Sequence, residues 1–351
     1  MTESIYEQLA AALDELPNGF PRTPSNIELT LLSKIFTPEE ASLASQLRGE
    51  MEPLDALSER IGLPAKEARD RLMRMVRRGM VWFERVAGAP RFRLAPFVVG
   101  IYEAQVDRLD HELAHLVEEY MAQGGAAGIM KPQPALHRVI PAQSALKSEW
   151  ILPYDDVRAI LLAAKAFRLG DCICRLQRGQ IGHPCSFPTK VCLSFSSVER
   201  PPGPGDVSRE EALALLDRVE QIGLVHTVSN VAQGIGYVCN CCGCCCAVLR
   251  GITSFGIEGS VAHANHYAVI DHEECSGCGT CIGRCQVQAI SEREGVAVVD
   301  REGCIGCGLC VSGCPHQVAR LQRKPDSETI HPPADYAAWE QERLRNRGLV
   351  G

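Results

Sequence analysis

A stretch near the C-terminus consists of two similar halves, and this repeat restricts the fold more than any other feature of the sequence. Residues 267–290 read YAVIDHEECSGCGTCIGRCQVQAI, and residues 296–319 read VAVVDREGCIGCGLCVSGCPHQVA. Eleven of the 24 aligned positions are identical, including every cysteine. Each half opens with alternating apolar residues, which predict a strand, before a Gly- and Cys-rich loop and a helical turn. The repeat therefore predicts a sandwich with approximate twofold symmetry around its cofactors.

The distribution of cysteine indicates metal binding rather than a disulfide framework. All 18 cysteines of this 351-residue chain lie between Cys172 and Cys314. Disulfides are typical of small secreted chains, whereas residues 1–12 lack the basic segment and apolar run of a signal peptide. No stretch approaches about 18 uninterrupted apolar residues, so we expect no membrane span. We therefore expect a cytoplasmic protein whose cysteines are thiolate ligands.

The repeat contains two cysteine motifs with the spacing that binds iron–sulfur clusters. The first motif comprises Cys275, Cys278, Cys281 and Cys285, and the second comprises Cys304, Cys307, Cys310 and Cys314. Gaps of two residues let three successive thiolates surround one cubane, and the fourth cysteine follows a helical turn that directs it to the other cluster. We therefore expect one [4Fe–4S] cluster on Cys275, Cys278, Cys281 and Cys314. The second cluster would use Cys304, Cys307, Cys310 and Cys285.

Over this repeat the chain resembles the bacterial dicluster ferredoxins, a family that implies two [4Fe–4S] clusters and the transfer of single electrons. The chain departs from the family pattern at Gln286, where proline usually follows the fourth cysteine. That proline shapes the turn and binds no iron, so we expect the departure to alter local geometry more than ligation. Zinc bound to two four-cysteine sites is the alternative, because CxxC spacing also suits zinc.

Ten further cysteines lie in the middle of the chain. Four are separated, namely Cys172, Cys174, Cys185 and Cys192, and six form one run, namely Cys239, Cys241, Cys242, Cys244, Cys245 and Cys246. Six thiolates within eight residues cannot all reach one cubane, so we expect one or two additional iron–sulfur centres. Within the run, Cys239, Cys242 and Cys245 repeat the ferredoxin spacing.

The division of these ten thiols between sites stays open at the level of sequence. Cys172, Cys174, Cys185 and Cys192 would form one site and the run another, or each site would draw on both segments. Zinc, reactive thiols or a vicinal disulfide between Cys241 and Cys242 are the alternatives to iron–sulfur clusters.

The whole cysteine arrangement is similar to that of a group of bacterial and archaeal proteins described only as 4Fe–4S binding. The similarity covers residues 134–315, including HRVIP at 137–141, CxCR and CNCCxCCC. It implies electron transfer but no particular substrate. Near the cysteines, Arg175 would either tune a cluster potential or form a surface salt bridge. His183, His263 and His266 are expected as hydrogen-bond partners of cluster sulfur more than as ligands.

The pattern along the chain predicts an α+β protein with several domains. Helix, turn, helix and hairpin signals give a winged-helix-like domain at 25–100, followed by a connecting helix at 101–129 and an extended linker at 130–148. An α-rich, cysteine-containing middle domain is expected at 149–262, with helices near 154–169 and after Ser208, whose spacing to Glu211 is that of a capping box. The dicluster domain occupies 266–322, and a polar tail with an exposed helix occupies 325–351.

Charge and motif together favour electron transfer. Residues 267–318 carry seven acids and three arginines, whereas residues 66–93 carry nine basic and three acidic side chains. We expect an electron carrier or oxidoreductase subunit that meets a redox partner protein, either a ferredoxin-like donor or an oxidoreductase. A reductase acting at the middle-domain cluster and a redox-sensing winged-helix regulator are the alternatives. DNA is the less favoured partner, and the sequence leaves the catalytic residues and the oligomeric state open.

Overall fold

The computed structural model describes residues 4–146 and 151–350. The first residues of the expected middle domain, 149 and 150, and the last residue of the expected tail lie outside the described residues. The chain is 42% helical and 18% strand, as expected for an α+β protein. It divides into two compact units, the first comprising Met1–Pro132, Gly179–His183 and Glu340–Gly351, and the second comprising Gln133–Arg178 and Pro184–Trp339. In the described parts of the chain, no helix has the length and apolar character that a membrane crossing requires.

Unit 1 contains the helix, turn, helix and hairpin that the sequence predicts. Helices α1 (Ile5–Asp14), α2 (Ile27–Ile35) and α3 (Pro38–Ala44) precede strand β1 (Glu52–Pro53), helices α4 (Leu54–Ile61) and α5 (Ala65–Arg77), and strands β2 (Val81–Val86) and β3 (Ala89–Leu94). The three strands pair in the order β1-β3-β2. Gly62 ends α4 at a φ of 71°, a conformation that glycine adopts without strain. Leu57 and Leu72 are fully buried, and α4 packs against α5.

The expectation of one connecting helix at 101–129 is wrong. After the π-type turn η1 (Phe97–Ile101), the segment consists of a 3₁₀ helix η2 (Glu103–Arg108), α6 (His111–Tyr120), a π-type segment η3 (Met121–Gly125) and α7 (Ala126–Met130). Asp110 starts a new helix because its side chain accepts a hydrogen bond from the Leu113 N–H. Gly124, at a φ of 123°, interrupts the helical path before α7. The cap at Asp110 and the interruption at Gly124 thus divide a segment whose apolar periodicity predicts one continuous helix.

The expectation of an exposed C-terminal helix is only partly correct, because Trp339 and Arg343 of this helix are buried. Helix α14 (Tyr336–Asn346) forms where the sequence predicts it, and its residues from Glu340 onward belong to unit 1. Arg343 is fully buried there, and its guanidinium donates hydrogen bonds to the Pro17, Pro132 and Ile129 carbonyls. Burial lowers the pKa of Arg343 to about 9. The polar composition of the tail is therefore no guide to its exposure, because Arg343 is buried and donates hydrogen bonds to carbonyl groups inside unit 1.

Unit 2 is built on an antiparallel sheet, which corrects the expected α-rich middle domain. Its six strands pair in the order β4-β8-β9-β6-β5-β7. They are β4 (His137–Ile140), β5 (Ala166–Asp171), β6 (Lys190–Ser196), β7 (Asp206–Val207), β8 (Val225–Ser229) and β9 (Tyr237–Cys241). Residues alternate between buried and half-buried along β6, a period of two that is typical of a strand and not of a helix. Strand β4 falls in the segment expected to be a linker.

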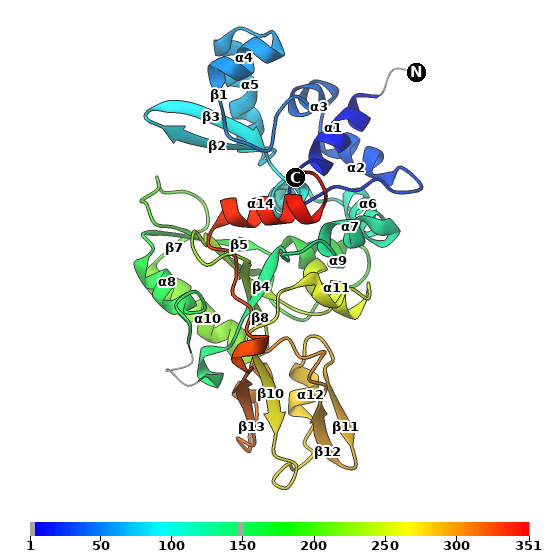
Figure 1. The fold of residues 1–351 in the computed structure, drawn as a ribbon, viewed down its shortest axis with the longest axis vertical. Coiled ribbons are helices and arrows are strands. Elements are labelled where there is room, and N and C mark those ends of the chain that lie inside the picture. Colours follow the sequence, from blue (N-terminus) through cyan, green and yellow to red (C-terminus); the bar gives the residue numbers. More distant parts are fainter. Residues whose placement is uncertain (1–3, 147–150, 351) are drawn as a thin grey trace. The chain divides into compact units, whose positions relative to one another are not determined.

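Four helices accompany this sheet (Figure 1). They are α8 (Val157–Ala163), α9 (Ile173–Gln180), α10 (Arg209–Ile222) and α11 (Ala247–Thr253). The expected helix at 154–169 is therefore only partly correct, because α8 ends at Ala163 and the following apolar residues form β5. The predicted capping box at the start of α10 is confirmed: Ser208 accepts a hydrogen bond from the Glu211 N–H, and the Glu211 side chain accepts one from the Ser208 N–H.

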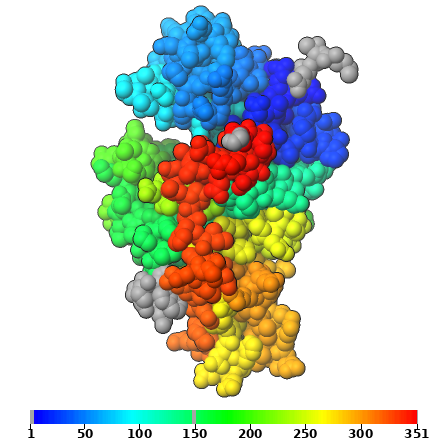
Figure 2. All heavy atoms as spheres, viewed as in Figure 1, coloured from blue at the N-terminus to red at the C-terminus, as the bar shows by residue number. Residues whose placement is uncertain are grey.

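The repeated segment forms a separate lobe at one end of unit 2 (Figures 1 and 2). Strand β10 (His266–Ile270) pairs with β13 (Ala319–Arg323), and β11 (Ile290–Arg293) pairs with β12 (Val296–Val299). Each two-stranded sheet therefore takes one strand from each half of the repeat. Helices α12 (Thr280–Arg284) and α13 (Leu309–Ser312) both begin after a glycine of positive φ, Gly279 and Gly308. The two halves of the repeat thus adopt the same order of elements.

Candidate metal centres

Two cavities in the lobe are each lined by four cysteines. One cavity is lined by Cys275, Cys278, Cys281 and Cys314, together with Ile270, Pro315 and other residues. The other is lined by Cys285, Cys304, Cys307 and Cys310, together with Ile305, Leu309 and other residues. In each cavity the fourth thiol comes from the other half of the repeat. The structure therefore brings together the two sets of thiols expected to share a cluster, and iron ligation by them stays a prediction.

The loops around these cavities fit a bulky polynuclear group. A Cβ atom on Gly277 would lie 2.2 Å from the Gly295 carbonyl oxygen, and one on Gly306 would lie 2.3 Å from the His266 carbonyl oxygen. Only glycine permits these close approaches, and both glycines have positive φ. The Ala289 N–H points to the Cys285 sulfur at 3.2 Å, and the Ala268 N–H points to the Cys304 sulfur at 3.5 Å. Such N–H groups stabilise thiolate charge and raise a cluster potential.

Burial keeps several of these thiols neutral when no metal is bound. It raises the pKa of Cys285 and of Cys307, and it raises the pKa of Cys310 to about 12. Cys278, which is exposed, differs because the Thr280 hydroxyl lowers the pKa of its thiol. A metal ligand must be a thiolate, so loading the second cavity releases protons.

The ten cysteines of the middle region separate into two groups of thiols. The first group consists of Cys185, Cys242, Cys244 and Cys245. The sulfur of Cys185 lies 3.8 Å from that of Cys242 and 3.6 Å from that of Cys244, and the Cys244 and Cys245 sulfurs are 3.6 Å apart. All four sulfurs lie within 4.8 Å of one another. We call this group the four-thiol site.

The second group is a closed ring of six thiols, which we call the six-thiol ring. In order around the ring, its members are Cys172, Cys174, Cys246, Cys241, Cys239 and Cys192. Each thiol lies close enough to both of its neighbours in this order for the two thiols to shift each other's pKa. Among the described residues, no three ring sulfurs share the mutual 4.8 Å spacing of the four-thiol site. The ring is therefore too wide for one metal ion and has the chemistry of a polynuclear thiolate site.

Strand pairing explains why each group of thiols contains both separated cysteines and cysteines of the run at 239–246. Leu193 of β6 is the register partner of Val238 of β9, so Cys192 and Cys239 are cross-strand neighbours. Cys239 and Cys241 point to the same side of β9 because side chains alternate along a strand. A turn then begins at Cys242, whose carbonyl accepts the Cys246 N–H at 3.1 Å. The ferredoxin-like spacing of Cys239, Cys242 and Cys245 is thus misleading, since Cys239 belongs to the ring and the other two to the four-thiol site.

Arg175 lies between the two groups of thiols. It is only 3% exposed, which excludes the surface salt bridge considered from the sequence. Its guanidinium donates to the Asn240 carbonyl at 2.8 Å and to the Pro188 carbonyl at 3.1 Å. Burial disfavours its charge, but the thiols of Cys172, Cys242 and Cys241 outweigh this effect and raise the pKa of Arg175. A permanent positive charge therefore faces both centres.

The three candidate histidines do not join these groups. Within the described residues, the close-spaced four-thiol site contains cysteines alone. His183 is exposed, and His263 and His266 lie just before or at the start of β10. Burial lowers the pKa of His266 to about 4. Ligation by histidine thus gains no support.

Gln286, which stands where dicluster ferredoxins usually have proline, connects the lobe to the four-thiol turn. Its side-chain carbonyl accepts the Gly243 N–H at 2.9 Å, and its amide donates to the Gly223 carbonyl at 2.9 Å. A Cβ atom on Gly243 would lie 1.8 Å from the Gln286 backbone oxygen. The glutamine therefore replaces a turn-shaping proline with a residue that fastens the loop after Cys285 to the middle region. Sequence reasoning noted the departure but missed this role.

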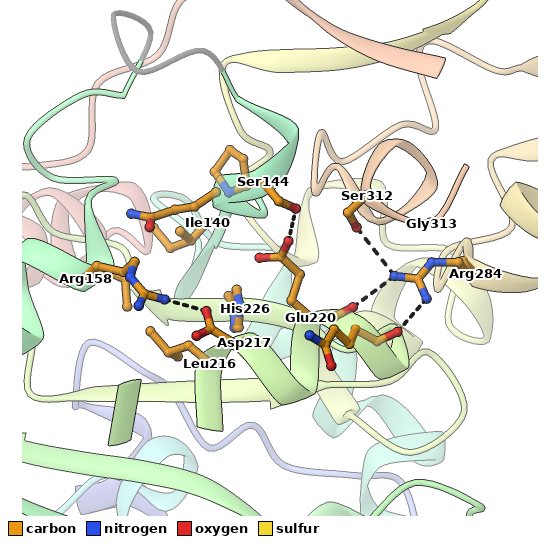
Figure 3. Close-up of a pocket in the computed structure, with 14 residues that line it drawn as sticks. Ile140, Ser144, Arg158, Leu216, Asp217, Glu220, His226, Arg284, Ser312 and Gly313 are labelled. Carbon is orange, nitrogen blue, oxygen red and sulfur yellow. Dashed lines mark hydrogen bonds and ion pairs between the residues drawn. The ribbon is translucent and has the colours of Figure 1, made fainter. Parts of the chain in front are cut away.

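A cavity of about 420 Å³ lies where the lobe meets the sheet (Figure 3). Its lining includes Arg284 and Ser312, next to the ferredoxin motif cysteines, and also includes Glu220 and His226. Arg284 fastens the lobe to α10 by donating to the Glu220 and Gln221 carbonyls at 2.9 and 2.8 Å. Its Nε also donates to the Leu309 carbonyl at 2.8 Å.

His226 has a defined tautomer in this cavity. The Asn240 amide donates to the Val191 carbonyl at 2.6 Å, so its oxygen faces the His226 Nδ1 at 2.7 Å and must accept a hydrogen bond. His226 Nδ1 therefore carries the proton, and burial lowers the pKa of this histidine. Asn240 itself stands between the ring residues Cys239 and Cys241. Sequence reasoning missed this connection, because it depends on the pairing of β8 with β9.

Comparison with known proteins identifies the lobe. Residues 268–321 match the family model described as 4Fe-4S dicluster domain. No curated protein and no solved structure matches the chain. The chain therefore carries a ferredoxin-like domain that binds iron–sulfur clusters, and its class is that of the iron–sulfur electron-transfer proteins.

Proposed function

We propose that the chain is a relay of three iron–sulfur centres that passes electrons between two redox partners. Cys275, Cys278, Cys281 and Cys314 hold the first [4Fe–4S] cluster, and Cys285, Cys304, Cys307 and Cys310 hold the second. The six-thiol ring, formed by Cys172, Cys174, Cys192, Cys239, Cys241 and Cys246, holds a third centre. Bound clusters supply one-electron exchange, so the chain needs no acid, base or nucleophile for this role.

The observation that carries the proposal is one shared apolar core. Cys239, Cys241 and Cys246 of the ring pack against the same cluster of buried side chains as Cys285, Cys304 and Cys307 of the lobe. Buried members of this core include Val287, Ile305 and Leu309. A second apolar cluster joins Cys275 and Cys281 to Cys285, Cys304 and Cys310. The three sets of thiols are thus connected in series through buried apolar side chains, as a relay requires.

The chemistry of the surface indicates where electrons enter or leave. The seven acids of residues 267–318 are all exposed, and Glu273, Glu274 and Glu302 lie close in sequence to the first cysteines of the two motifs. A basic face on a partner protein would be attracted to this acidic lobe. The partner is therefore expected to bind more weakly as salt is added.

The winged-helix-like arrangement at 25–100 is proposed as a platform for a protein partner. Several of its basic side chains are already paired: Arg78 with Glu40, Arg71 with Glu67 and Arg93 with Glu340. Arg74 and Arg77 on α5 are exposed. These pairings reduce the charge available to phosphates, so a DNA-binding regulator is the less favoured role. Unchanged, salt-dependent DNA binding after Arg74→Ala and Arg77→Ala would show that these arginines do not read DNA.

The cavity that contains His226 favours a second candidate function, reduction of a small polar molecule. The cavity is lined by residues from both the lobe and the sheet, and Asn240 links His226 to the ring segment. A ligand that binds there would perturb the spectrum of the ring centre, and His226→Gln would weaken that perturbation.

A reductive titration under anaerobic conditions tests the relay. We expect the wild-type protein to accept about three electrons per chain, two in the lobe and one in the ring. Cys192→Ser should reduce the number to about two and leave the electron paramagnetic resonance signals of the lobe in place. Lys190→Gln, an exposed position at the start of the same strand, is the matched control and should accept three. A wild-type protein that accepts only two electrons would refute the third centre.

A further inference from the structure

The four-thiol site differs in kind from the sites assigned to iron–sulfur clusters. The Cys185–Cys244, Cys244–Cys245 and Cys185–Cys242 sulfur–sulfur distances are 3.6, 3.6 and 3.8 Å, and no pair exceeds 4.8 Å. Four thiolates bound at about 2.3 Å to one tetrahedral ion stand about 3.8 Å apart, by the geometry of a tetrahedron. A cubane places four separate metal atoms between its ligands and keeps the thiolates further apart.

The lobe provides an internal standard for this comparison. Among the described residues, the four-thiol site is the one group of three or more candidate ligands within 4.8 Å of each other. The four thiols around each cavity of the lobe, which are proposed to hold [4Fe–4S] clusters, do not approach one another so closely. The spacing in the four-thiol site is therefore a property of that site and not of cysteine-rich loops in general.

We propose that Cys185, Cys242, Cys244 and Cys245 bind one tetrahedral zinc ion, which is separate from the iron–sulfur relay. Four protein ligands complete the coordination of zinc and leave no open position, so the ion is structural. Among divalent ions of the first transition row, zinc binds such ligands more tightly than iron(II) does. This proposal goes beyond the electron relay and does not depend on it.

The ion fastens a loop to a turn that are far apart in sequence. Cys185 lies in the loop between α9 and β6, and Cys242 lies 57 residues further along, just after β9. The turn formed by Cys242, Cys244 and Cys245 leads directly to ring residue Cys246, whose N–H donates to the Cys242 carbonyl. Zinc would therefore fix the position of one ring thiol without taking part in electron transfer.

The charge around the site suits a zinc ion with four thiolates. Such a centre carries a net charge of −2, and the buried guanidinium of Arg175 beside Cys242 offsets part of it. Cys242 and Cys245 are buried, at 1% and 2% exposure, whereas Cys244 is exposed. Zinc can thus enter from the Cys244 side while the remaining ligands are held by the core.

Zinc content and zinc-edge X-ray absorption of the wild-type protein test the proposal without any variant. We expect one zinc per chain, with about four sulfur neighbours at about 2.3 Å. Cys185→Ser should lose zinc and keep the iron and sulfide of the lobe, whereas Cys192→Ser should lose iron and keep zinc. Ser186→Ala, at the exposed position next to Cys185, is the matched control and should keep both metals.

A second variant tests the proposal even if the Cys185→Ser protein does not fold. Cys244→His retains a zinc ligand at the exposed position, so it should keep one zinc with three sulfur neighbours and one nitrogen neighbour. Loss of iron and sulfide together in Cys185→Ser, with no zinc in the wild type, would overturn the proposal in favour of an iron–sulfur cluster. A single iron without sulfide at this site would overturn the assignment to zinc.

Discussion

Gly243→Ala tests the connection between the lobe and the middle region. The added Cβ atom would lie 1.8 Å from the Gln286 backbone oxygen, whereas an ordinary contact needs at least 3.4 Å. The two segments must therefore separate by roughly 1.6 Å, because the obstacle is backbone and cannot rotate away. Such a separation breaks the hydrogen bonds that Gln286 makes with Gly243 and Gly223.

The expected cost combines steric strain with lost hydrogen bonds. Overpacking costs about 1–3 kcal/mol and each of the two hydrogen bonds about 1 kcal/mol, so we expect a loss of about 3–5 kcal/mol in the free energy of unfolding. Urea unfolding monitored by circular dichroism measures this quantity. Electron transfer between the lobe and the ring should also slow, because the displaced segment begins one residue after Cys285.

A nearby glycine supplies the control for this experiment. A Cβ atom on Gly283, in α12, meets no atom within 4 Å, so Gly283→Ala should be neutral or slightly stabilising. If Gly243→Ala unfolds at the same urea concentration as the wild type and transfers electrons equally fast, the contact between Gly243 and Gln286 does not hold the lobe in place.

Three further predictions concern charge, acid stability and the attachment of the lobe. Arg175→Met should lower the reduction potential of the ring centre by on the order of 100 mV, about 2 kcal/mol for one electron, because a buried positive charge is lost; an unchanged potential in a redox titration would refute this role. Burial lowers the pKa of His137 to about 4, so the folded state binds a proton at His137 only at a lower pH than the unfolded state does. Stability from this group is complete above pH 6.5 and falls by about 3 kcal/mol as the pH drops towards 4. His137→Gln should flatten this dependence in unfolding measurements, and parallel curves would contradict the expectation. Arg284→Ala removes three hydrogen bonds from a guanidinium to carbonyls and should destabilise unit 2 by about 2–4 kcal/mol in urea unfolding, whereas a loss below about 0.5 kcal/mol would show that the lobe is held by other contacts.

The lobe could be predicted from the sequence because its information is local. The lobe is specified by the cysteine spacing, by Gly279 and Gly308 before the short helices, and by the repeat itself. Each of these signals can be seen within a short stretch of sequence. The capping box of Ser208 and Glu211 is equally local, and it was predicted correctly.

The grouping of the thiols in the middle region could not be predicted, because it depends on which strands pair and in which register. The neighbours Cys192 and Cys239 meet only through the register of β6 with β9, and nothing near either residue reveals the other. The apolar residues around Phe167 fit a helix as well as a strand, and their pairing with β6 and β7 decides for the strand. Gln286 could be recognised as a departure, but its two hydrogen-bond partners lie far away in sequence.

Iron, acid-labile sulfide and zinc measured together in one anaerobically purified sample test the central claim most directly. We expect about twelve irons per chain with an equal amount of sulfide, together with one zinc. That result places a third iron–sulfur centre on the six-thiol ring. About eight irons, with the ring thiols free or bound to additional zinc, would confine electron transfer to the lobe and contradict the relay.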